Sequence, residues 1–548
     1  MTMHLLYIEA INLSQVIDDT QDLATRRAAS QMLLDMVHQV AAKLNGLASA
    51  ISTGASKGLF EAKSLADLKR AKQIAADVLA SPYHNLLQVE VVGTDDLPHV
   101  TERFSELTAQ LQAEVRRRQA CSLTVHWSEP PSTAMLSALQ AQHPRMVGKR
   151  QPHQVVCQLD QVRPAVMALK GKSRDEPDTP VSWPVAVRRL EGRVWRQKLF
   201  KHLLSQDFSA ADDAVDDAPP VRDLLERFSN DLESLTKDGN KRLDGKMALL
   251  YADGNSFGKI AQACQTPEQL RRWDNALQGA RKQFLAKLLD LVRQRRDASG
   301  GTALQIEVLM WGGDEFLLVL PAALGLQAAQ CFFEHCRPRL PDGVPPPDDL
   351  PTPCQPSHAV SLVFAHRNSP IEPLQELVKS LAEQGKQGVY KHHDSLNCIV
   401  LESFDHAGQD LDRYWQRRGL HTVHWRDMAL NPKRLEDLLA AAPKVLPHLP
   451  RSGLYKVLAD LVAWVDPSSA PGLLERRYKS LHEQLDSQCK LAWPPLWKAL
   501  QPQSLGQQPV EADGSHPQHA HLNAWLMLLE LWDYLPMSNT ATQKEVTA

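Results

Sequence analysis

The sequence predicts an α+β protein with two units of similar order, a segment between them, and a helical C-terminal part. Two apolar runs, at 4–9 and 247–253, each resemble a buried strand that precedes a helical pattern and then a glycine-containing hairpin. The residues after 405 are rich in Leu, Ala and Trp with helical spacing, which is typical of a helical bundle. These patterns divide the chain into domains at 1–100, 101–245, 246–405 and 406–548.

The first unit is predicted to run strand, helix, hairpin, helix, strand. "HLLYIE" is a short apolar run of strand type, and Gly54 marks a turn between two further short runs. The predicted elements are a strand at 4–9, a helix from Ser14 to about Asn45, strands at 49–53 and 58–62, a helix at 64–80 and a strand at 86–92.

The second unit repeats this order and extends it. "MALLYADGNSFGKI" begins as an apolar strand and breaks at Gly254. The predicted elements after it are a helix at 267–295, hairpin strands at 304–310 and 316–321, a helix at 322–337, a strand at 358–366, a helix at 370–387 and a strand at 397–403. Residues 206–220, which precede this unit, are acidic and end in prolines, which indicates a surface loop or linker.

The charge balance excludes a broadly basic protein. The 548 residues include 61 Lys and Arg against 64 Asp and Glu, a formal net charge of −3. Nucleic-acid binding would therefore need local patches or partner subunits, and the alternative is no direct binding. Eight cysteines without a CxxC pair favour a reducing compartment. The N-terminus has no signal-peptide pattern and no apolar run is long enough to span a membrane, so we expect a cytoplasmic location.

Three carboxylates are the candidate catalytic residues. Asp253 ends an apolar strand, while Asp314 and Glu315 lie at the tip of the hairpin "IEVLMWGGDEFLLVLP". If the two strands are neighbours, the carboxylates meet, and clustered carboxylates are usually neutralised by a hard divalent cation. Mg²⁺ or Mn²⁺ with phosphate oxygens fits nucleotide chemistry. The alternative is that "GGDE" is only a tight turn.

The same residues carry a family resemblance. "ADGNSFGKI" together with "WGGDEF" resembles the palm-type nucleotidyl cyclase and polymerase superfamily. In its diguanylate cyclase branch a Lys stands where this chain has Gly258. In the large palm-domain subunit of type III CRISPR effector complexes the hairpin is "GGDD", and this chain departs from that pattern at Asn255 and Glu315. The segment 357–387 and the N-terminal "INLSQVIDDTQDLATRRAASQMLL" are similar to segments of the CRISPR subunit and favour that branch.

The resemblance implies a fold with two palm domains, which are ferredoxin-like and related to GGDEF domains. The first palm would be degenerate, because "ISTGASKGLFEA" has no acidic hairpin and Glu9 is alone. "VCQLDQVRPA" resembles a zinc knuckle in which Asp160 replaces the second Cys, so zinc is not expected. The HD nuclease domain of many family members is expected to be missing, and His393-Asp394 is predicted to be a solvated loop after the second palm.

The resemblance also implies an activity, the synthesis of cyclic oligoadenylate from ATP. Two nucleoside triphosphates would bind between the palms, with the metal held by Asp253, Gly254, Asp314 and Glu315. The nucleotide-binding residues would be Gly254, Asn255, Ser256, Phe257, Lys259, Gly312, Gly313 and Lys386. The alternative for Lys259 is that it only solvates the start of a helix, and Phe257 is equally well explained as a core residue.

The family partners would be guide and target RNA and sister subunits, which the C-terminal bundle contacts. Two other functions stay open from the sequence. One is a catalytically weak scaffold subunit, which Asn255 favours. The other is a diguanylate cyclase.

Overall fold

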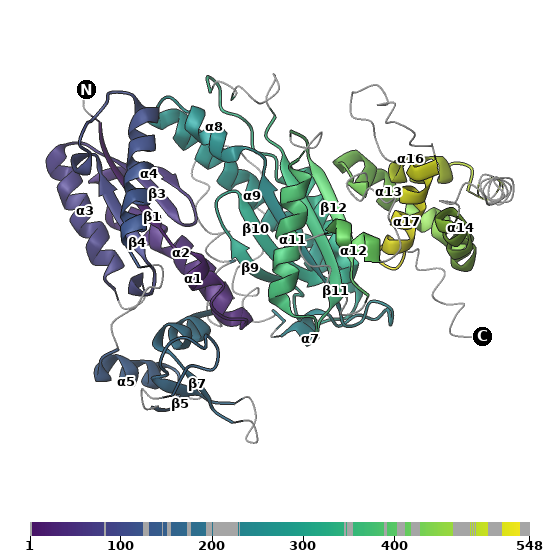
Figure 1. Ribbon diagram of the computed structural model, residues 1–548, viewed down its shortest axis with the longest axis horizontal. Coiled ribbons are helices and arrows are strands. Elements are labelled where there is room, and N and C mark those ends of the chain that lie inside the picture. The colour runs from purple at the N-terminus through teal and green to yellow at the C-terminus, as the bar shows by residue number, and fades with distance from the viewer. Residues whose placement is uncertain are drawn as a thin grey trace.

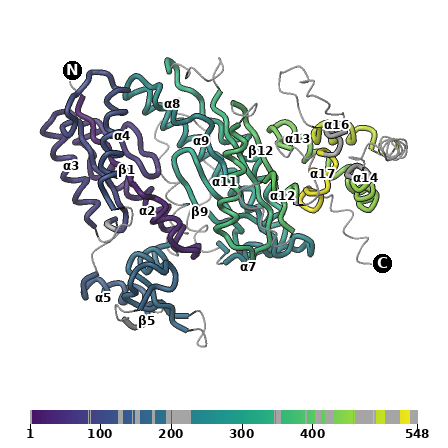
Figure 2. Tube along the Cα trace, viewed as in Figure 1, coloured from purple at the N-terminus to yellow at the C-terminus, as the bar shows by residue number. Residues whose placement is uncertain are grey.

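The computed structural model of the protein describes residues 3–81, 84–123, 131–144, 146–150, 155–171, 177–192, 200, 228–229, 231–344, 347, 355–387, 392–402, 411–417, 428–463, 483, 485, 487, 489–501 and 518–536. The first unit, the second unit and the C-terminal helices follow one another along the longest axis, and the segment between the units lies beside the first (Figure 1). The tube view shows the same order, from purple to yellow (Figure 2). The predicted linker at 206–220 lies outside the described residues.

The first unit is an antiparallel sheet with strand order β2-β3-β1-β4. Its elements are β1 (His4–Ala10), α1 (Ser14–Ile17), α2 (Leu23–Lys43), β2 (Ala48–Thr53), β3 (Lys57–Ala62), α3 (Leu65–Leu79), β4 (Val89–Gly93) and α4 (Phe104–Cys121). This is the βαββαβ order of a ferredoxin-like unit, followed by one more helix. The single helix expected from Ser14 to Asn45 is wrong. The chain breaks after α1, and Asp22 caps α2 by accepting a hydrogen bond from the backbone N–H of Thr25 at 3.0 Å.

The alternation of apolar residues along β1 supplies the cores on both faces of this sheet. Leu6 and Ile8 lie in one core with residues of α2 and α3, whereas Leu5 and Tyr7 lie in a second core with residues of α4. A boundary at residue 100 would separate α4 from the face that it covers. We therefore propose that the first unit extends through α4.

The second unit is a five-stranded sheet with order β12-β11-β8-β10-β9. Its elements are β8 (Lys246–Gly254), α8 (Phe257–Ala263), α9 (Pro267–Ala298), β9 (Glu307–Trp311), β10 (Glu315–Pro321), α10 (Gly325–His335), β11 (His358–His366), α11 (Ile371–Gly385) and β12 (Ser395–Val400). Its first four strands repeat the order of the first unit, and β12 adds a parallel strand beside β11. The repeated order that the sequence predicts is confirmed, as is the α+β class.

Each unit places its first long helix on the edge strand of the other. In α2, the Oγ of Ser30 accepts a hydrogen bond from the backbone N–H of Trp311 in β9 at 3.2 Å. In α9, the carboxylate of Asp274 accepts one from the backbone N–H of Thr53 in β2 at 3.1 Å. A buried ion pair between Arg27 and Glu307 also joins α2 to β9, with 2.7 Å between Nη2 and Oε2. The two units therefore meet in a reciprocal, nearly two-fold arrangement.

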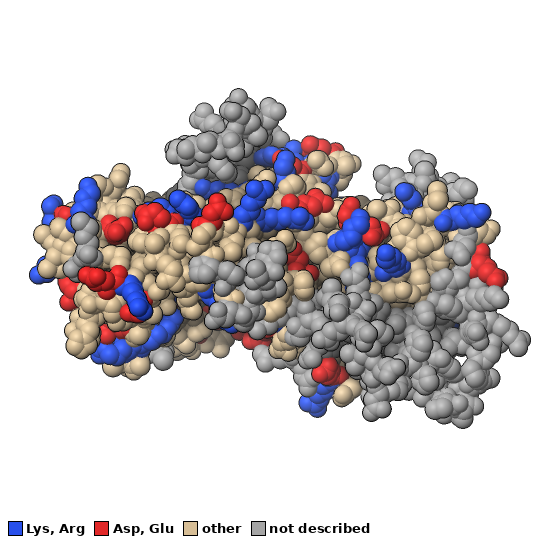
Figure 3. Space-filling view, turned by 90° about the horizontal axis from the view of Figure 1, so that it is seen from above, with Lys and Arg blue, Asp and Glu red and all other residues tan. Residues whose placement is uncertain are grey.

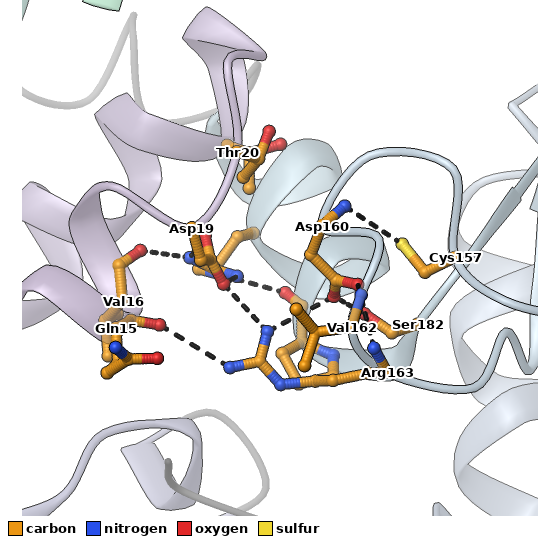
Figure 4. Close-up of polar contacts among 12 residues, drawn as sticks. Gln15, Val16, Asp19, Thr20, Cys157, Asp160, Val162, Arg163 and Ser182 are labelled. Atoms are coloured by element: carbon orange, nitrogen blue, oxygen red, sulfur yellow. Dashed lines mark hydrogen bonds and ion pairs between the residues drawn. The ribbon is translucent and has the colours of Figure 1, made fainter. Parts of the chain in front are cut away.

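The segment between the units carries α5 (Thr133–Gln142) and a small sheet of β5 (Val147–Arg150), β6 (Met167–Leu169) and β7 (Thr179–Val181). The knuckle-like turn is held by hydrogen bonds centred on Asp160 (Figure 4). Its carboxylate accepts bonds from Ser182 Oγ at 2.7 Å and from the backbone N–H of Arg163 at 3.1 Å. The guanidinium of Arg163 also bonds Asp19 of the first unit at 2.8 Å. A short helix, α7 (Leu232–Leu235), precedes the second unit.

The C-terminal part is helical, as expected. It contains α12 (Leu411–Arg417), α13 (Pro432–Val445), α14 (Arg451–Ala463), α16 (Trp493–Leu500) and α17 (Gln518–Leu531). Trp493 and Trp525 stack with ring centroids 5.8 Å apart, and this core is continuous with that of the second unit. None of the described helices is both long enough and apolar enough to cross a membrane.

Candidate functional site

The strand register brings two of the predicted carboxylates together. β8 and β10 are antiparallel neighbours, and Asp253 lies directly opposite Glu315. The apolar runs on both sides of these residues determine this register, because a slip by one residue would turn each strand's buried face outward. Asp314 precedes Glu315 at the tip of the hairpin. The pairing of the two strands that the sequence predicts is confirmed.

Hydrogen bonds and burial define the electrostatics of this pair. The hydroxyl of Tyr251 donates to Glu315 at 2.7 Å, and the ammonium of Lys386, after α11, forms an ion pair with Asp253. Burial, with the nearby charges of Asp314 and Glu315, raises the pKa of Asp253 to about 6, although Lys386 opposes the rise. The site therefore holds more negative charge than its single ammonium balances.

The oxygen ligands fit a hard divalent cation with few protein ligands. Within the described residues no group of three or more His, Cys, Asp or Glu is close enough together to hold a metal ion, so the predicted set of three carboxylates does not converge. The Asp253 and Glu315 pair remains. Mg²⁺ commonly takes one or two carboxylates and completes its shell with water and phosphate oxygens.

The glycine turn is held by a residue that the sequence did not single out. The guanidinium of Arg281, in α9, donates to the carbonyl of Gly313 and lies 5.0 Å from the ring centre of Trp311. The turn closes through a hydrogen bond from the N–H of Gly312 to the carbonyl of Glu315 at 2.9 Å. A Cβ at Gly312 would lie 3.3 Å from the Cβ of Ala55 in the first unit.

The turn from β8 into α8 requires a glycine at position 254. A Cβ on Gly254 would lie 2.4 Å from the ring of Phe257. That ring is buried and packs edge-on against Trp273 at 5.2 Å, as the core interpretation of Phe257 expects. Ser256 has a left-handed backbone, with φ of 61°. Gly258 and Lys259 lie exposed at the start of α8.

Asn255 is buried and bonded to residues outside the carboxylate pair. Its side chain is 3% exposed, and its amide donates to Ser357 Oγ at 3.0 Å and to the carbonyl of His393 at 3.2 Å. His393 and Asp394 lie inside the second unit, between α11 and β12, so the prediction that they follow it is wrong. Asp394 accepts a hydrogen bond from the backbone N–H of His358 at 2.8 Å, which fixes the start of β11.

A cleft of about 650 Å³ opens in front of the hairpin, between the two units. A volume of this size accommodates a nucleotide. The first unit contributes Tyr7, Ser52, residues 54–59 and part of α4, and the second contributes Phe257, Gly258, part of α9 and residues 310–315.

The first unit has a corresponding pair of facing residues, in which a cation replaces one of the two carboxylates. Tyr7 and Glu9 in β1 correspond to Tyr251 and Asp253 in β8, and Glu9 lies opposite Lys57 where Asp253 lies opposite Glu315. The buried Glu9 is fully engaged. It accepts from Tyr7 Oη at 2.9 Å and from Arg116 at 2.8 Å, and Lys57 lies 3.2 Å away. The residue opposite Glu9 is thus a cation and not a second acid, and Lys57 and Arg116 balance its charge.

The charges elsewhere on the molecule are mixed. On the face seen from above, Lys and Arg alternate with Asp and Glu across the described residues (Figure 3). This agrees with the net charge of −3. This face therefore shows no large patch of one sign comparable to the local sign difference between the two hairpins (Figure 3).

The fold and the site together define a class: a two-unit α+β protein with a carboxylate pair at a glycine hairpin and a cleft between the units. The chain matches no protein-family model and no curated protein. Among solved structures it is similar to Csm1, solved alone and with Csm4, including a Csm1-Csm4 subcomplex of the type III-A CRISPR-Csm interference complex.

Three of these structures illustrate the likeness. Csm1 in a Csm1-Csm4 cassette with pppApA is 13% identical, with a TM-score of 0.48, covering 98% of this chain and 70% of that chain. Csm1 from T.onnurineus is 12% identical, with a TM-score of 0.46, covering 97% and 70%. Csm1 in a cassette with cA4 is 12% identical, with a TM-score of 0.46, covering 97% and 70%.

Proposed function

We propose that the protein is a metal-dependent nucleotidyl cyclase that converts ATP into a cyclic oligoadenylate, as the large subunit of a type III CRISPR-like complex. The observation that carries the proposal is the direct pairing of Asp253 with Glu315 beside a cleft lined by both units. The choice of ATP, and of guide and target RNA and sister subunits as partners, follows from the resemblance of the palm motifs.

The residues have distinct roles in this reaction. Asp253 and Glu315 would hold Mg²⁺ or Mn²⁺, which lowers the pKa of the attacking 3′-hydroxyl and stabilises the departing pyrophosphate. Lys386, which pairs with Asp253 in the free protein, would bind phosphate once Asp253 binds the cation. Gly312 and Gly313 leave space for the phosphates to approach the backbone of the hairpin.

The first unit would hold the second nucleotide. Lys57 lines the cleft, and Arg116 already neutralises Glu9, so the ammonium of Lys57 keeps donors for a phosphate. The ion pair of Glu9 with two cations also explains why only one unit would be catalytic.

A scaffold function is the second candidate. The side chain of Asn255 donates its hydrogen bonds to Ser357 and His393. Lys386 forms an ion pair with Asp253. These contacts are consistent with a palm that binds nucleotide without turnover. Such a subunit would hold RNA and sister subunits.

The test is mass spectrometry of products after incubation of the protein with each nucleoside triphosphate and Mg²⁺ or Mn²⁺. The Asp314→Ala/Glu315→Ala variant should make no product. The control is Glu436→Ala/Asp437→Ala, which removes an adjacent acidic pair from the exposed surface of α13 and should leave the product unchanged.

The products separate the candidates. A linear or cyclic oligoadenylate that the first variant loses supports the cyclase. Cyclic diguanylate would make the protein a diguanylate cyclase. If no product forms, even with co-purified subunits and RNA, while nucleotide still binds, the scaffold function is the better explanation.

A further inference from the structure

We infer that the conformation of the hairpin turn at 312–314 depends on the first unit through one face of α9. Arg281 on this face is the residue that positions the turn. This inference rests on the proposed function for its catalytic consequence, but the contacts that carry it are structural. The face consists of Arg271, Asp274, Gln278 and Arg281, and we call it the coupling face.

The coupling face is continuous along the helix. Its residues are spaced by three or four positions, so their side chains lie on one side of α9. The first three contact β2 of the first unit, and the fourth contacts the hairpin turn of the second unit. One rigid helix thus connects the edge of one sheet to the turn of the other.

The contacts with β2 are specific hydrogen bonds. Arg271 Nε donates to the carbonyl of Ala50 at 2.9 Å. Asp274 accepts from Ser52 Oγ at 3.0 Å and from the N–H of Thr53 at 3.1 Å. The side-chain amide of Gln278 donates to Asp274 at 2.7 Å and to Thr53 Oγ1 at 3.0 Å. Since buried polar groups without partners are costly, these bonds fix how β2 lies on α9.

The contact with the turn is made by a partly buried cation. Arg281 donates to the carbonyl of Gly313 and covers the ring of Trp311. Its Nε is buried without a hydrogen-bond partner, and burial lowers its pKa although the charges of Asp314 and Asp274 oppose this. A partly buried guanidinium persists where its interactions outweigh its desolvation, and the hydrogen bond and the ring contact of Arg281 are both made with the hairpin.

The first unit reaches the same turn from two other directions. Ser30 in α2 accepts the hydrogen bond from the N–H of Trp311, and Ala55 lies against Gly312. Two consecutive glycines have many backbone conformations open to them. The turn therefore needs outside contacts to hold Asp314 and Glu315 in place, and most of those contacts originate in the first unit or in the helix seated on it.

The first test measures hydrogen exchange of the hairpin peptide covering 307–321. Arg281→Met should speed exchange at the turn by about tenfold or more, because a charged hydrogen bond is lost. Asp274→Ala should speed exchange in the same peptide, although the hydrogen bonds of Asp274 go to β2 and to Gln278 and not to the hairpin. Arg281→Lys should recover part of the protection, because an ammonium can also donate to Gly313. The control is Arg272→Met, an exposed arginine on the same helix, which should behave as wild type.

The second test measures product formation by the same variants. If the cyclase function holds, Arg281→Met and Asp274→Ala should lower kcat about tenfold or more with KM little changed, and the double variant should be no worse than the poorer single variant, because both act through one element. If wild type makes no product, the proposed function fails while the exchange experiment still decides the coupling. The inference is overturned if Asp274→Ala leaves the exchange of 307–321 unchanged, or if Arg281→Met matches Arg272→Met.

Discussion

At the scale of single residues, Gly254 shows how packing limits the site. Gly254→Ala would place a methyl group 2.4 Å from the buried ring of Phe257, so we expect a loss of about 1 to 3 kcal/mol in the free energy of unfolding. Gly313→Ala is the matched control, because no atom lies within 4 Å of its added Cβ. Urea unfolding should show a clear loss for the first variant and less than about 1 kcal/mol for the second. Equal losses would contradict the packing argument.

His358 predicts a pH dependence of stability. The ring is buried between Phe257 and Phe332, and although burial lowers its pKa, Asp394 and Cys336 raise that pKa to about 9. The folded pKa thus lies above the ordinary value of about 6.5. The charged ring therefore stabilises the fold fully below pH of about 6.5, and the contribution, up to about 3 kcal/mol, is lost as the pH rises through about 9.

The measurement for His358 is thermal unfolding at several pH values from 6 to 10. Wild type should lose stability over the upper part of this range more steeply than His358→Asn, which has no titrating ring. Parallel profiles for the two proteins would show that the ring is neutral in the fold.

At the scale of elements, we expect the fold of the knuckle-like turn at 156–165 to be stable without a bound metal ion. Asp160 supplies the acceptor that organises this turn (Figure 4). The hydrogen bonds from Ser182, Val162 and Arg163, with the charge of Arg163, hold the pKa of Asp160 below its usual range although burial opposes them. Asp160→Ala would remove one of the two carboxylates that Arg163 contacts, together with the acceptor for Ser182, and we expect a loss of about 2 to 4 kcal/mol.

A chelator separates this turn from a zinc knuckle. Prolonged treatment with EDTA should leave the thermal unfolding of wild type unchanged, whereas Asp160→Ala should unfold at a lower temperature. Because the folded pKa of Asp160 is low, its contribution should persist at neutral pH and disappear as the pH falls below about 4. Stoichiometric zinc in the purified protein, lost together with stability, would refute the prediction.

The elements also show which parts of the fold could be predicted from the sequence. The strands at 4–9 and 358–366 were predictable because a short, continuous apolar run bounded by polar residues is typical of a buried strand. The break before α2 was missed because Asp22 caps a helix that the apolar pattern alone continues. The pairing of Asp253 with Glu315 followed from topology, but the corresponding Glu9 and Lys57 pair was not recognised. The repeated Tyr-x-acid at 7–9 and 251–253 was the signal that could have revealed it.

Long-range contacts were out of reach for a different reason. Arg281, Asp274 and Ser30 act on residues that lie far away in the sequence. Nothing in a helical pattern says which strand a polar side chain on its surface will meet. Such contacts depend on how the two units are placed relative to each other. Composition and hydrophobic periodicity describe only neighbouring residues and do not predict this placement.

At the scale of the whole molecule, the ion pair between Arg27 and Glu307 tests how the units depend on each other. Both side chains are buried, with 6% and 2% exposed. Arg27→Met or Glu307→Met alone would remove one charge of a buried ion pair and keep the other, and should cost about 3 to 5 kcal/mol. The double variant should be much closer to wild type in urea unfolding, because both charges are removed together.

An exposed pair provides the control for this cycle. Arg103 and Glu106 bond at 3.0 Å but are 80% and 45% exposed, so the same substitutions there should change stability by less than about 1 kcal/mol. If the Arg27 and Glu307 single variants are as mild as these, the two units are not held together by this pair.

The reciprocal seating of the units has a consequence for aggregation. An edge strand with free backbone groups is a template onto which another chain can add. Here Arg271 and Asp274 occupy backbone groups of β2, and Ser30 occupies one of β9. β12 is closed by paired backbone bonds between Leu396 and Leu430 at 2.7 and 2.8 Å. Separation of the units would uncover β2 and β9 at the same moment, so intermolecular strand addition should begin at these two edges when the protein partly unfolds.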